Sequence, residues 1–372
     1  MSHKAFVSTN TAHPLGRLGW DDGWEREFFA HNGSHEGWAP GRVIRVDRGQ
    51  CDVHIADGTV RAVMSVSTRH PEHGICTGDW VIVDVHSDPA SVRGYLPRRT
   101  AFVRGTSSGR SQGQVLAANV DHVGIVVSLA LEPDLGRIER LLALAWESGG
   151  SPLIALTKAD LVPDPAGLAY LVDDVANIAP GVHVLPISSL TGEGLDVLRA
   201  MISDGTSVLL GVSGAGKSTL ANLLLGEDVM AVQTTRDADG KGRHTTTTRN
   251  LFLLPDGGVL IDTPGLRGVG LWDAEIGVGE VFSEIEDLAS QCRFHDCGHT
   301  AEPGCAVAEA LEDGRLPERR LDSYRKLLRE NRHVLAKSDA RLRSELRKEW
   351  KQRSAEGRMM YDAKRGRPPR SG

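Results

Sequence analysis

The chain has 372 residues, too many for one ordinary hydrophobic core, and its length predicts two or three domains. A hydrophobic content of 40% and a charged content of 25% are typical of a soluble globular protein. No apolar run approaches the roughly 18 residues that would span a bilayer. The N-terminus also lacks the apolar core of an export signal. We therefore expect a cytoplasmic protein with no membrane partner.

The net charge of −6 is unevenly distributed along the chain. Residues 341–372 contain eleven Lys or Arg against four Asp or Glu, a surplus of +7, so residues 1–340 carry −13. A basic tail on an acidic body is typical of proteins that bind nucleic acid. A solvated tail that keeps the protein soluble accounts for the same composition equally well.

The first hundred residues predict an arm followed by a small barrel. Residues 1–37 are polar apart from the run at 18–29, and they predict a loose arm with one short helix. Between residues 38 and 104, short β-branched runs alternate with turn residues. Several short strands in about sixty residues favour a closed β-barrel of the OB type. The Ser- and Gly-rich stretch at 105–117 predicts a linker.

Residues 118–275 alternate between apolar strand runs and helical stretches. This alternation predicts a mostly parallel sheet covered by helices on both faces. Residues 276–335 form a predicted helical module, and residues 336–372 a basic tail. The runs that we expect to be strands are 122–129, 152–157, 183–188, 206–211 and 258–263.

GVSGAGKS (residues 211–218) has the spacing of a phosphate-binding loop, and it lies between an apolar run and a helical run, as such a loop should. Glycines let backbone N–H groups and a helix N-terminus approach phosphate oxygens. Lys217 would neutralise the β- and γ-phosphates, and the Ser218 hydroxyl would ligate Mg²⁺. The residues expected to contact the nucleotide here are Gly211, Val212, Ser213, Gly214, Ala215, Gly216, Lys217, Ser218 and Thr219.

Two further segments are candidates for switches that sense the γ-phosphate. IDTPG (residues 261–265) ends a buried run, so Asp262 could hold the Mg²⁺ shell and the Gly265 N–H could meet the γ-phosphate. KGRHTTTT (residues 241–248) lies in a polar stretch before it. We expect Thr245 or Thr246 to ligate Mg²⁺, although a threonine run at a strand edge is a credible alternative for the last two threonines.

LTKAD (residues 156–160) and ISSLTGEG (residues 187–194) each follow a strand run and predict guanine recognition. Asp160 can accept hydrogen bonds from guanine N1 and N2, which adenine cannot supply, so such a site rejects the wrong base. Thr157 and Lys158 would support the base, the lysine with its stem along the base plane. Ser188 and Ser189 could bring an N–H to guanine O6.

The order of these motifs is unusual, because the base-recognition motifs precede the phosphate loop and both switches. All these loops would lie at the carboxyl edge of one sheet, so a circular permutation leaves the site intact. The Asp262 switch then leads directly into the C-terminal module, and loss of the γ-phosphate could be transmitted there.

CRFHDCGHTAEPGC gives the pattern Cys292-x₄-Cys297-x-His299-x₅-Cys305. Three thiolates and one imidazole suit a tetrahedral, closed structural zinc site. With no export signal, a disulfide framework is not expected. The alternative is a chance cluster of reduced thiols. We leave His295, a spare nitrogen, out of the predicted shell.

A permuted G domain after a small barrel and before a Cys/His module resembles the ribosome small-subunit-dependent GTPase family (RsgA type), over roughly residues 38–335. The resemblance rests on TKAD, GVSGAGKS, GRHTTT, DTPG, the zinc spacing and ANVDHVGIV at 118–126. It implies a multidomain α/β protein with an OB-like barrel, a circularly permuted P-loop G domain and a helical zinc module. It also implies late maturation of the small ribosomal subunit, with subunit-stimulated GTP hydrolysis and subsequent release of the factor, which we expect to be a monomer.

The sequence departs from common GTPase patterns at two positions. Thr157 stands where GTPases often have Asn, although its hydroxyl can still bond locally. Leu266 follows DTPG, so no glutamine is available there to orient the attacking water. We therefore expect slow intrinsic hydrolysis that needs a partner. His244 is a candidate to position that water; a surface histidine that contacts RNA or solvent is an equal alternative.

Ribosomal RNA phosphates are the expected partner of exposed cations in the barrel, zinc module and tail. Two other functions stay open: an RNA-binding scaffold with a poorly active nucleotide site, and a P-loop ATPase of another pathway. Asp160 argues against ATP. The named candidates for phosphate contact are Arg42, Arg45, Arg48, Arg61, Lys364, Arg365, Arg367 and Arg370.

Overall fold

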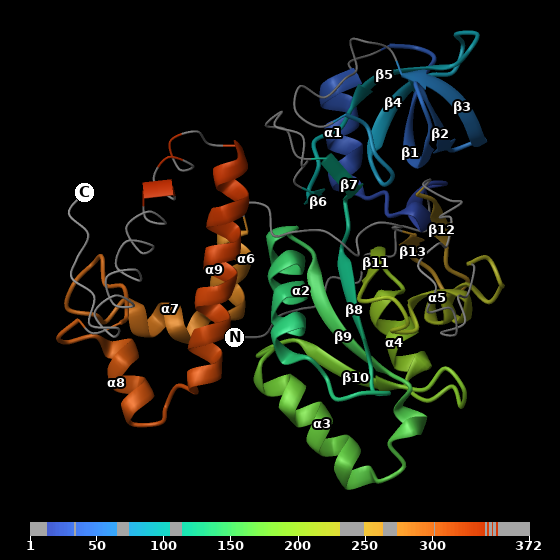
Figure 1. Cartoon of the computed structure of the whole chain (residues 1–372). Coiled ribbons are helices and arrows are strands. Elements are labelled where there is room, and N and C mark those ends of the chain that lie inside the picture. The colour runs from blue at the N-terminus through green and yellow to red at the C-terminus, as the bar shows by residue number, and fades with distance from the viewer. Residues whose placement is uncertain are drawn as a thin grey trace.

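A closed barrel, a two-stranded sheet and a six-stranded sheet follow one another along the chain, with a helical region beyond them (Figure 1). Among the residues described, no helix is both long and apolar enough to cross a membrane. The computed structural model describes residues 13–32, 35–64, 74–104, 114–230, 249–262, 274–300 and 302–338, with residues 341, 344, 347 and 348.

The N-terminal segment packs onto the barrel. It contains a 3-10 turn and a helix, η1 (Gly16–Leu18) and α1 (Asp22–Asn32). Trp20, Trp24 and Phe28, spaced four residues apart, are buried, and the Trp20 ring meets the Trp80 ring edge-on with centroids 4.8 Å apart. The short helix is confirmed. The expectation of a loose arm is wrong for residues 13–32, because this aromatic face has a partner on the barrel.

Five strands close the barrel in the order β1-β2-β3-β5-β4, with β1 antiparallel to both β2 and β4. Alternate side chains of β2 are buried, as expected where one sheet face lines a core. The strand formed by residues 91–95 has the sequence SVRGY, whose low apolar content makes it hard to recognise as a strand from sequence. The bounds are β1 (Trp38–Val46), β2 (Gln50–Ile55), β3 (Gly58–Met64), β4 (Trp80–Asp84) and β5 (Ser91–Tyr95).

A two-stranded antiparallel sheet connects the barrel to the large sheet. It consists of β6 (Ala101–Arg104) and β7 (Gln114–Ala118). The second strand begins inside the stretch 105–117 that predicts a linker, so residues 114–117 are extended and paired rather than loose. Val115, Leu116, Ala117 and Ala118 are all buried, which explains why they are ordered in a strand.

The six-stranded sheet has the order β10-β9-β8-β11-β13-β12 and is parallel except for its last strand. The strand that precedes the phosphate loop, β11, is therefore central. Since parallel strands point the same way, the loops after β9, β10, β11 and β13 emerge at one edge. The bounds are β8 (His122–Ser128), β9 (Ser151–Thr157), β10 (His183–Ile187), β11 (Thr206–Leu210), β12 (Leu251–Leu253) and β13 (Val259–Ile261).

Helices cover both faces of this sheet (Figure 1). Along β9, Ile154 and Leu156 belong to the core shared with α2 and α3, whereas Leu153 and Ala155 belong to the core shared with α4 and α5. This alternation is why the strand reads as a continuous apolar run. The helices are α2 (Leu135–Glu147), α3 (Pro165–Asn177), α4 (Leu195–Ile202) and α5 (Lys217–Leu225), with a short turn η3 (Ala159–Leu161).

The first and the last of the C-terminal helices pack against α2 (Figure 1). Gly277 permits a close approach, since a Cβ there would lie 2.0 Å from the Ala143 carbonyl oxygen. The buried carboxylate of Glu139 on α2 accepts hydrogen bonds from Arg319 and Arg320 at 3.0 and 2.8 Å. These helices are α6 (Glu275–Val281), α7 (Ser283–Ala289), α8 (Ala306–Glu312) and α9 (Glu318–Ser338). The predicted fold class is thereby confirmed.

Candidate functional site

The phosphate loop connects β11 directly to α5, as the sequence predicts. Gly211 has a φ of 146°, and a Cβ there would lie 2.3 Å from the Val126 carbonyl oxygen, so only glycine fits. Gly216 has a φ of 92° and forms the left-handed N-cap of the helix. The Lys217 ammonium donates to the Val212 carbonyl at 2.6 Å within the loop. Ser218 and Thr219 occupy the first turn of α5, where backbone N–H groups suit an anion.

The first base-recognition motif is attached to the phosphate loop by two side chains. The Thr157 hydroxyl is buried and donates to the Ala215 carbonyl at 2.6 Å. The Lys158 ammonium donates to the Gly214 carbonyl at 3.2 Å, and its backbone is left-handed, with a φ of 60°. Thr157 therefore does make the local bond expected of it in place of an asparagine.

The second base-recognition motif meets the first. The Ser188 hydroxyl donates to the Asp160 carboxylate at 2.6 Å and accepts hydrogen bonds from the backbone N–H groups of Leu190 and Thr191. Ser188 is fully buried and Ser189 half-buried. The two motifs that the sequence assigns to guanine thus lie together at the carboxyl ends of neighbouring strands β9 and β10.

Asp262 lies at the end of β13, next to the strand that carries the phosphate loop. Its backbone N–H donates to the Asn250 carbonyl at 2.9 Å, which continues the pairing of β12 with β13. Sequence reasoning did not identify Asn250, because a backbone acceptor leaves no side-chain signature. The other expected switch residues lie outside the described residues: His244, Thr245, Thr246 and Gly265.

Cys292, Cys297, His299 and Cys305 come together as predicted, with their ligand atoms all within 4.8 Å of one another. The Nδ1 of His299 lies 3.6 Å from the Cys292 sulfur and 3.5 Å from the Cys305 sulfur, and these two sulfurs are 3.9 Å apart. Tetrahedral zinc with ordinary bond lengths requires sulfur–nitrogen and sulfur–sulfur separations of about 3.6 and 3.8 Å. The donor set therefore fits zinc. His295 is exposed and does not belong to the cluster.

The surroundings of the cluster favour ligating protonation states at Cys292 and His299 but not at Cys297. The His299 backbone N–H lowers the pKa of Cys297, but burial and the neighbouring thiols outweigh it and raise that pKa to about 11. Burial raises the pKa of the Cys292 thiol, but N–H groups at Val307 and Ala306 and the neighbouring thiols more than offset this, so its pKa is lowered. Burial lowers the pKa of His299, which keeps its imidazole neutral. The Cys305 sulfur caps α8 by accepting from the Ala308 N–H at 3.3 Å. Helix N-termini and N–H donors stabilise thiolates.

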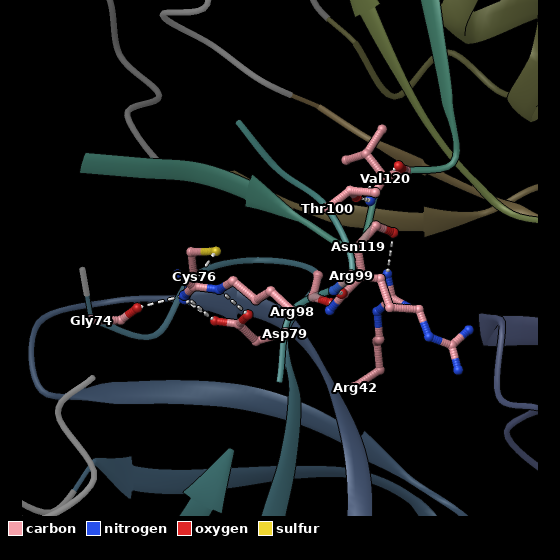
Figure 2. Close-up of polar contacts among 10 residues, drawn as sticks. Arg42, Gly74, Cys76, Asp79, Arg98, Arg99, Thr100, Asn119 and Val120 are labelled. Atoms are coloured by element: carbon pink, nitrogen blue, oxygen red, sulfur yellow. Dashed lines mark hydrogen bonds and ion pairs between the residues drawn. The ribbon is translucent and has the colours of Figure 1, made fainter. Parts of the chain in front are cut away.

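The expectation that Arg42 contacts RNA phosphates is wrong, because its side chain is 1% exposed. The guanidinium donates to the Asn119 carbonyl at 3.1 Å (Figure 2). It also donates to the Leu18 carbonyl at 3.1 Å and to the Thr206 hydroxyl at 3.0 Å. It also lies over the Trp80 ring. Burial lowers its pKa to about 10, although nearby carboxylates oppose this. Arg42 thus joins the N-terminal segment, the barrel and the large sheet.

The other three barrel candidates for phosphate contact, Arg45, Arg48 and Arg61, are exposed. Arg61 is paired with Asp47 and Asp52 at 2.6 and 2.8 Å, which neutralises part of its charge. Arg45 is 3.5 Å from Asp47, and Arg48 lies in the turn between β1 and β2. The tail candidates Lys364, Arg365, Arg367 and Arg370 fall outside the described residues.

Comparison with known proteins gives the same result as the geometry. The RsgA GTPase family model matches residues 95–272. The small ribosomal subunit biogenesis GTPase RsgA of Streptomyces avermitilis is 67% identical over 359 residues, which cover 96% of each chain. The protein of that name from Methanosarcina acetivorans is 42% identical and covers 83% of each chain.

Two solved structures share the fold. YjeQ from Thermotoga maritima is 26% identical with a TM-score of 0.60, and the match covers 79% of this chain and 98% of that one. YloQ, described as a circularly permuted GTPase, is 25% identical with a TM-score of 0.58, over 81% and 97% of the two chains. Because it matches RsgA proteins over nearly its whole length and shares their permuted fold, this chain belongs to the RsgA GTPase family.

Proposed function

We propose that this protein hydrolyses GTP to GDP and phosphate as a late maturation factor of the small ribosomal subunit. The subunit stimulates hydrolysis, and hydrolysis releases the factor. The observation that carries the GTPase assignment is the hydrogen bond from Ser188 to Asp160, 2.6 Å long, beside a phosphate loop that Thr157 holds. A carboxylate fixed in this way suits guanine N1 and N2 and leaves polar groups unpaired against adenine.

The phosphate-binding part of the site neutralises the charge of the phosphates and holds their oxygens in place. Lys217 neutralises the β- and γ-phosphates, while successive N–H groups of residues 211–219 hold their oxygens. Ser218, Asp262 and either Thr245 or Thr246 are the proposed magnesium ligands. Magnesium bound with GTP neutralises charge that develops between the β- and γ-phosphates. The Gly265 N–H senses the γ-phosphate.

Water activation depends on a partner, because Leu266 follows DTPG where a glutamine would orient the water. His244 is the proposed substitute, and it would position the water once the subunit is bound. A His244→Ala variant should keep slow basal turnover and lose most of the stimulated rate. Unchanged stimulated turnover in this variant would remove His244 from the mechanism.

The metal centre is proposed to be structural. Cys292, Cys297, His299 and Cys305 would supply four ligands to zinc, which leaves no open position for a substrate. Zinc bound there would lock the loop between α7 and α8 and support the helices that pack against α2.

The ribosomal assignment follows from the relatives, which are named small ribosomal subunit biogenesis GTPases. In the proposed complex, exposed cations contact RNA phosphates rather than bases, since aromatic residues make up only 5% of the chain. The protein would act as a monomer in the cytoplasm. The proposed contact residues are Arg45, Arg48, Arg61, Lys364, Arg365, Arg367 and Arg370.

Two rival functions are less well supported. An RNA-binding scaffold with a decayed nucleotide site should have lost some essential residues, yet Lys217, Ser218, Asp262 and Asp160 are all present. A P-loop ATPase of another pathway has no use for the Ser188–Asp160 pair.

The decisive experiment measures GTP hydrolysis by the purified protein with and without small ribosomal subunits, with ATP and Lys217→Ala as controls. We expect slow basal turnover that rises steeply with subunits and vanishes in the variant. Turnover indifferent to ribosomes would remove the ribosomal assignment and keep the GTPase. No GTP turnover in either condition would favour the scaffold.

A further inference from the structure

The barrel loop at residues 74–79 lies against the backbone at the end of β7, just before the first strand of the large sheet. The Ala118 N–H donates to the Thr77 carbonyl, and the Asn119 amide donates to the Gly78 carbonyl, both at 3.1 Å. Gly78 has a φ of 95°, and a Cβ there would lie 2.2 Å from the Ala118 carbonyl oxygen. The two backbones therefore touch with no side chain between them.

This loop is held in one conformation by a buried ion pair (Figure 2). Arg98 contacts both carboxylate oxygens of Asp79 at 2.7 Å, and the Asp79 side chain is 3% exposed. The same carboxylate accepts from the Cys76 N–H at 2.8 Å, and Arg98 also donates to the Gly74 carbonyl at 2.6 Å. A satisfied buried network of this kind is rigid. The loop can therefore transmit a displacement of the barrel.

The same loop reaches the chain that leads into Asp262. Thr77 is buried, and its hydroxyl donates to the Arg249 carbonyl at 3.1 Å. The next residue, Asn250, forms an antiparallel β-bridge with Arg45 on β1. The Asn250 carbonyl in turn accepts the Asp262 N–H at 2.9 Å. The barrel is thus connected to a proposed magnesium ligand through two adjacent residues.

We infer that Thr77 is a positioning residue for nucleotide hydrolysis. Its hydroxyl fixes residues 249–250 to the barrel, and these residues fix the backbone of Asp262 beside the phosphate loop. Since the contact joins two regions, a partner that shifts the barrel changes the nucleotide site, and the nucleotide changes the affinity for that partner by the same factor. This inference rests on the proposed function.

The test compares Thr77→Val, which removes the hydroxyl and keeps the side-chain shape, with Thr77→Ser, which retains the hydroxyl. Thr59→Val is the matched control, because Thr59 is an exposed barrel threonine whose hydroxyl contacts His54 on the neighbouring strand. For each protein we would measure the affinity for a non-hydrolysable GTP analogue with and without magnesium. We would also measure the affinity of each protein for GDP without magnesium and its GTP turnover with small subunits.

Magnesium should raise the affinity of the wild type for the GTP analogue, and in Thr77→Val we expect this increase to be about fivefold to tenfold smaller. The turnover stimulated by small subunits should fall by a similar factor. Both changes are of the size expected when one coupling contact is lost. GDP affinity without magnesium should stay unchanged, and Thr77→Ser and Thr59→Val should behave like the wild type. If Thr77→Val keeps both quantities within twofold, the inference is wrong. A general loss of folding would instead lower the GDP affinity and the melting temperature.

The proposed function and the role of Thr77 are tested by different measurements. If small subunits do not stimulate the wild type, the proposed partner is wrong, and the magnesium-dependent affinity of Thr77→Val still decides the positioning role. If the wild type binds no GTP analogue at all, the proposed function and this inference both fall.

Discussion

The Thr157 hydroxyl donates to the Ala215 carbonyl at 2.6 Å and so ties the base-recognition loop to the phosphate loop. Both groups are buried, so the bond is protected from water. A buried carbonyl that loses its partner costs about 1–3 kcal/mol. The contact spans 58 positions in the sequence and connects two motifs whose order in the chain the permutation changes.

We predict that Thr157→Val weakens GTP binding about tenfold, because the phosphate loop loses this support. Calorimetric titration with GTP would measure the effect. Thr157→Ser keeps the hydroxyl and should bind as the wild type does. A valine variant whose GTP affinity lies within twofold of the wild type would show that the Thr157 hydroxyl does not support GTP binding.

The metal centre predicts a zinc-dependent C-terminal region. The purified protein should contain one zinc ion per chain, and Cys305→Ser should lose the metal and melt at a lower temperature. The Cys305 sulfur also caps α8, so both effects weaken the same helix. Metal content by mass spectrometry and thermal unfolding would measure the two quantities.

His295→Ala is the matched control for the metal, since His295 lies among the ligands in sequence but is exposed. It should keep a full zinc content. Loss of zinc in this control, or retention of it in Cys305→Ser, would contradict the four-residue shell of Cys292, Cys297, His299 and Cys305.

Buried charge holds the C-terminal helices against α2. Glu139 is 0% exposed and pairs with Arg320, which is 7% exposed. We predict that Glu139→Gln lowers the unfolding free energy by about 1–3 kcal/mol, because the buried Arg320 guanidinium loses one of its two carboxylate partners and keeps only Glu284. Urea unfolding followed by circular dichroism would measure this.

A second ion pair between the same two helices, α2 and α9, serves as the control for the Glu139 prediction. Arg140 and Glu330 also pair, but their side chains are 39% and 30% exposed. Glu330→Gln should therefore cost about 0–1 kcal/mol. Equal losses in the two variants would mean that burial does not set the strength of these pairs.

The nucleotide motifs and the metal cluster were predictable because their chemistry is local. A phosphate loop needs glycines such as Gly211 and Gly216 at positions with positive φ or close backbone contacts. A zinc site needs four ligands, which here lie within a short stretch of sequence. The alternation of buried strands and helices also predicted a mostly parallel sheet, which the structure has. Trp24 and Phe28 lie on one buried face of α1, but nothing in the sequence indicates that the barrel is the partner of this face.

Polar contacts between residues far apart in the chain could not be predicted from the sequence. Arg42 sits in a strand like any surface arginine, and its burial depends on Asn119 and Thr206, which lie 77 and 164 positions away. Thr77 meets Arg249 across 172 positions through a backbone carbonyl. No residue pattern specifies such a partner, because every residue offers a carbonyl.

The N-terminal segment makes a prediction about pH. Burial raises the pKa of Asp21, but hydrogen bonds from Arg99 and from the Trp24 N–H outweigh it and lower the pKa below its ordinary value of about 3.9. A lowered pKa stabilises the fold above that value, and this stabilisation is lost as pH falls through the folded pKa. Asp21→Asn keeps the helix-capping acceptor and removes the charge that pairs with Arg99 at 2.6 Å.

We therefore expect the wild type to melt above Asp21→Asn at neutral pH, with a small difference because the pair is about half exposed and screened by salt. The difference should shrink below about pH 4 and in high salt. Asp57→Asn, in the exposed turn between β2 and β3, controls for a general change of charge. Melting curves from pH 7 to pH 3 measure both variants. A gap that persists unchanged at pH 3 would mean that Asp21 acts through its shape at the helix cap and not through its charge.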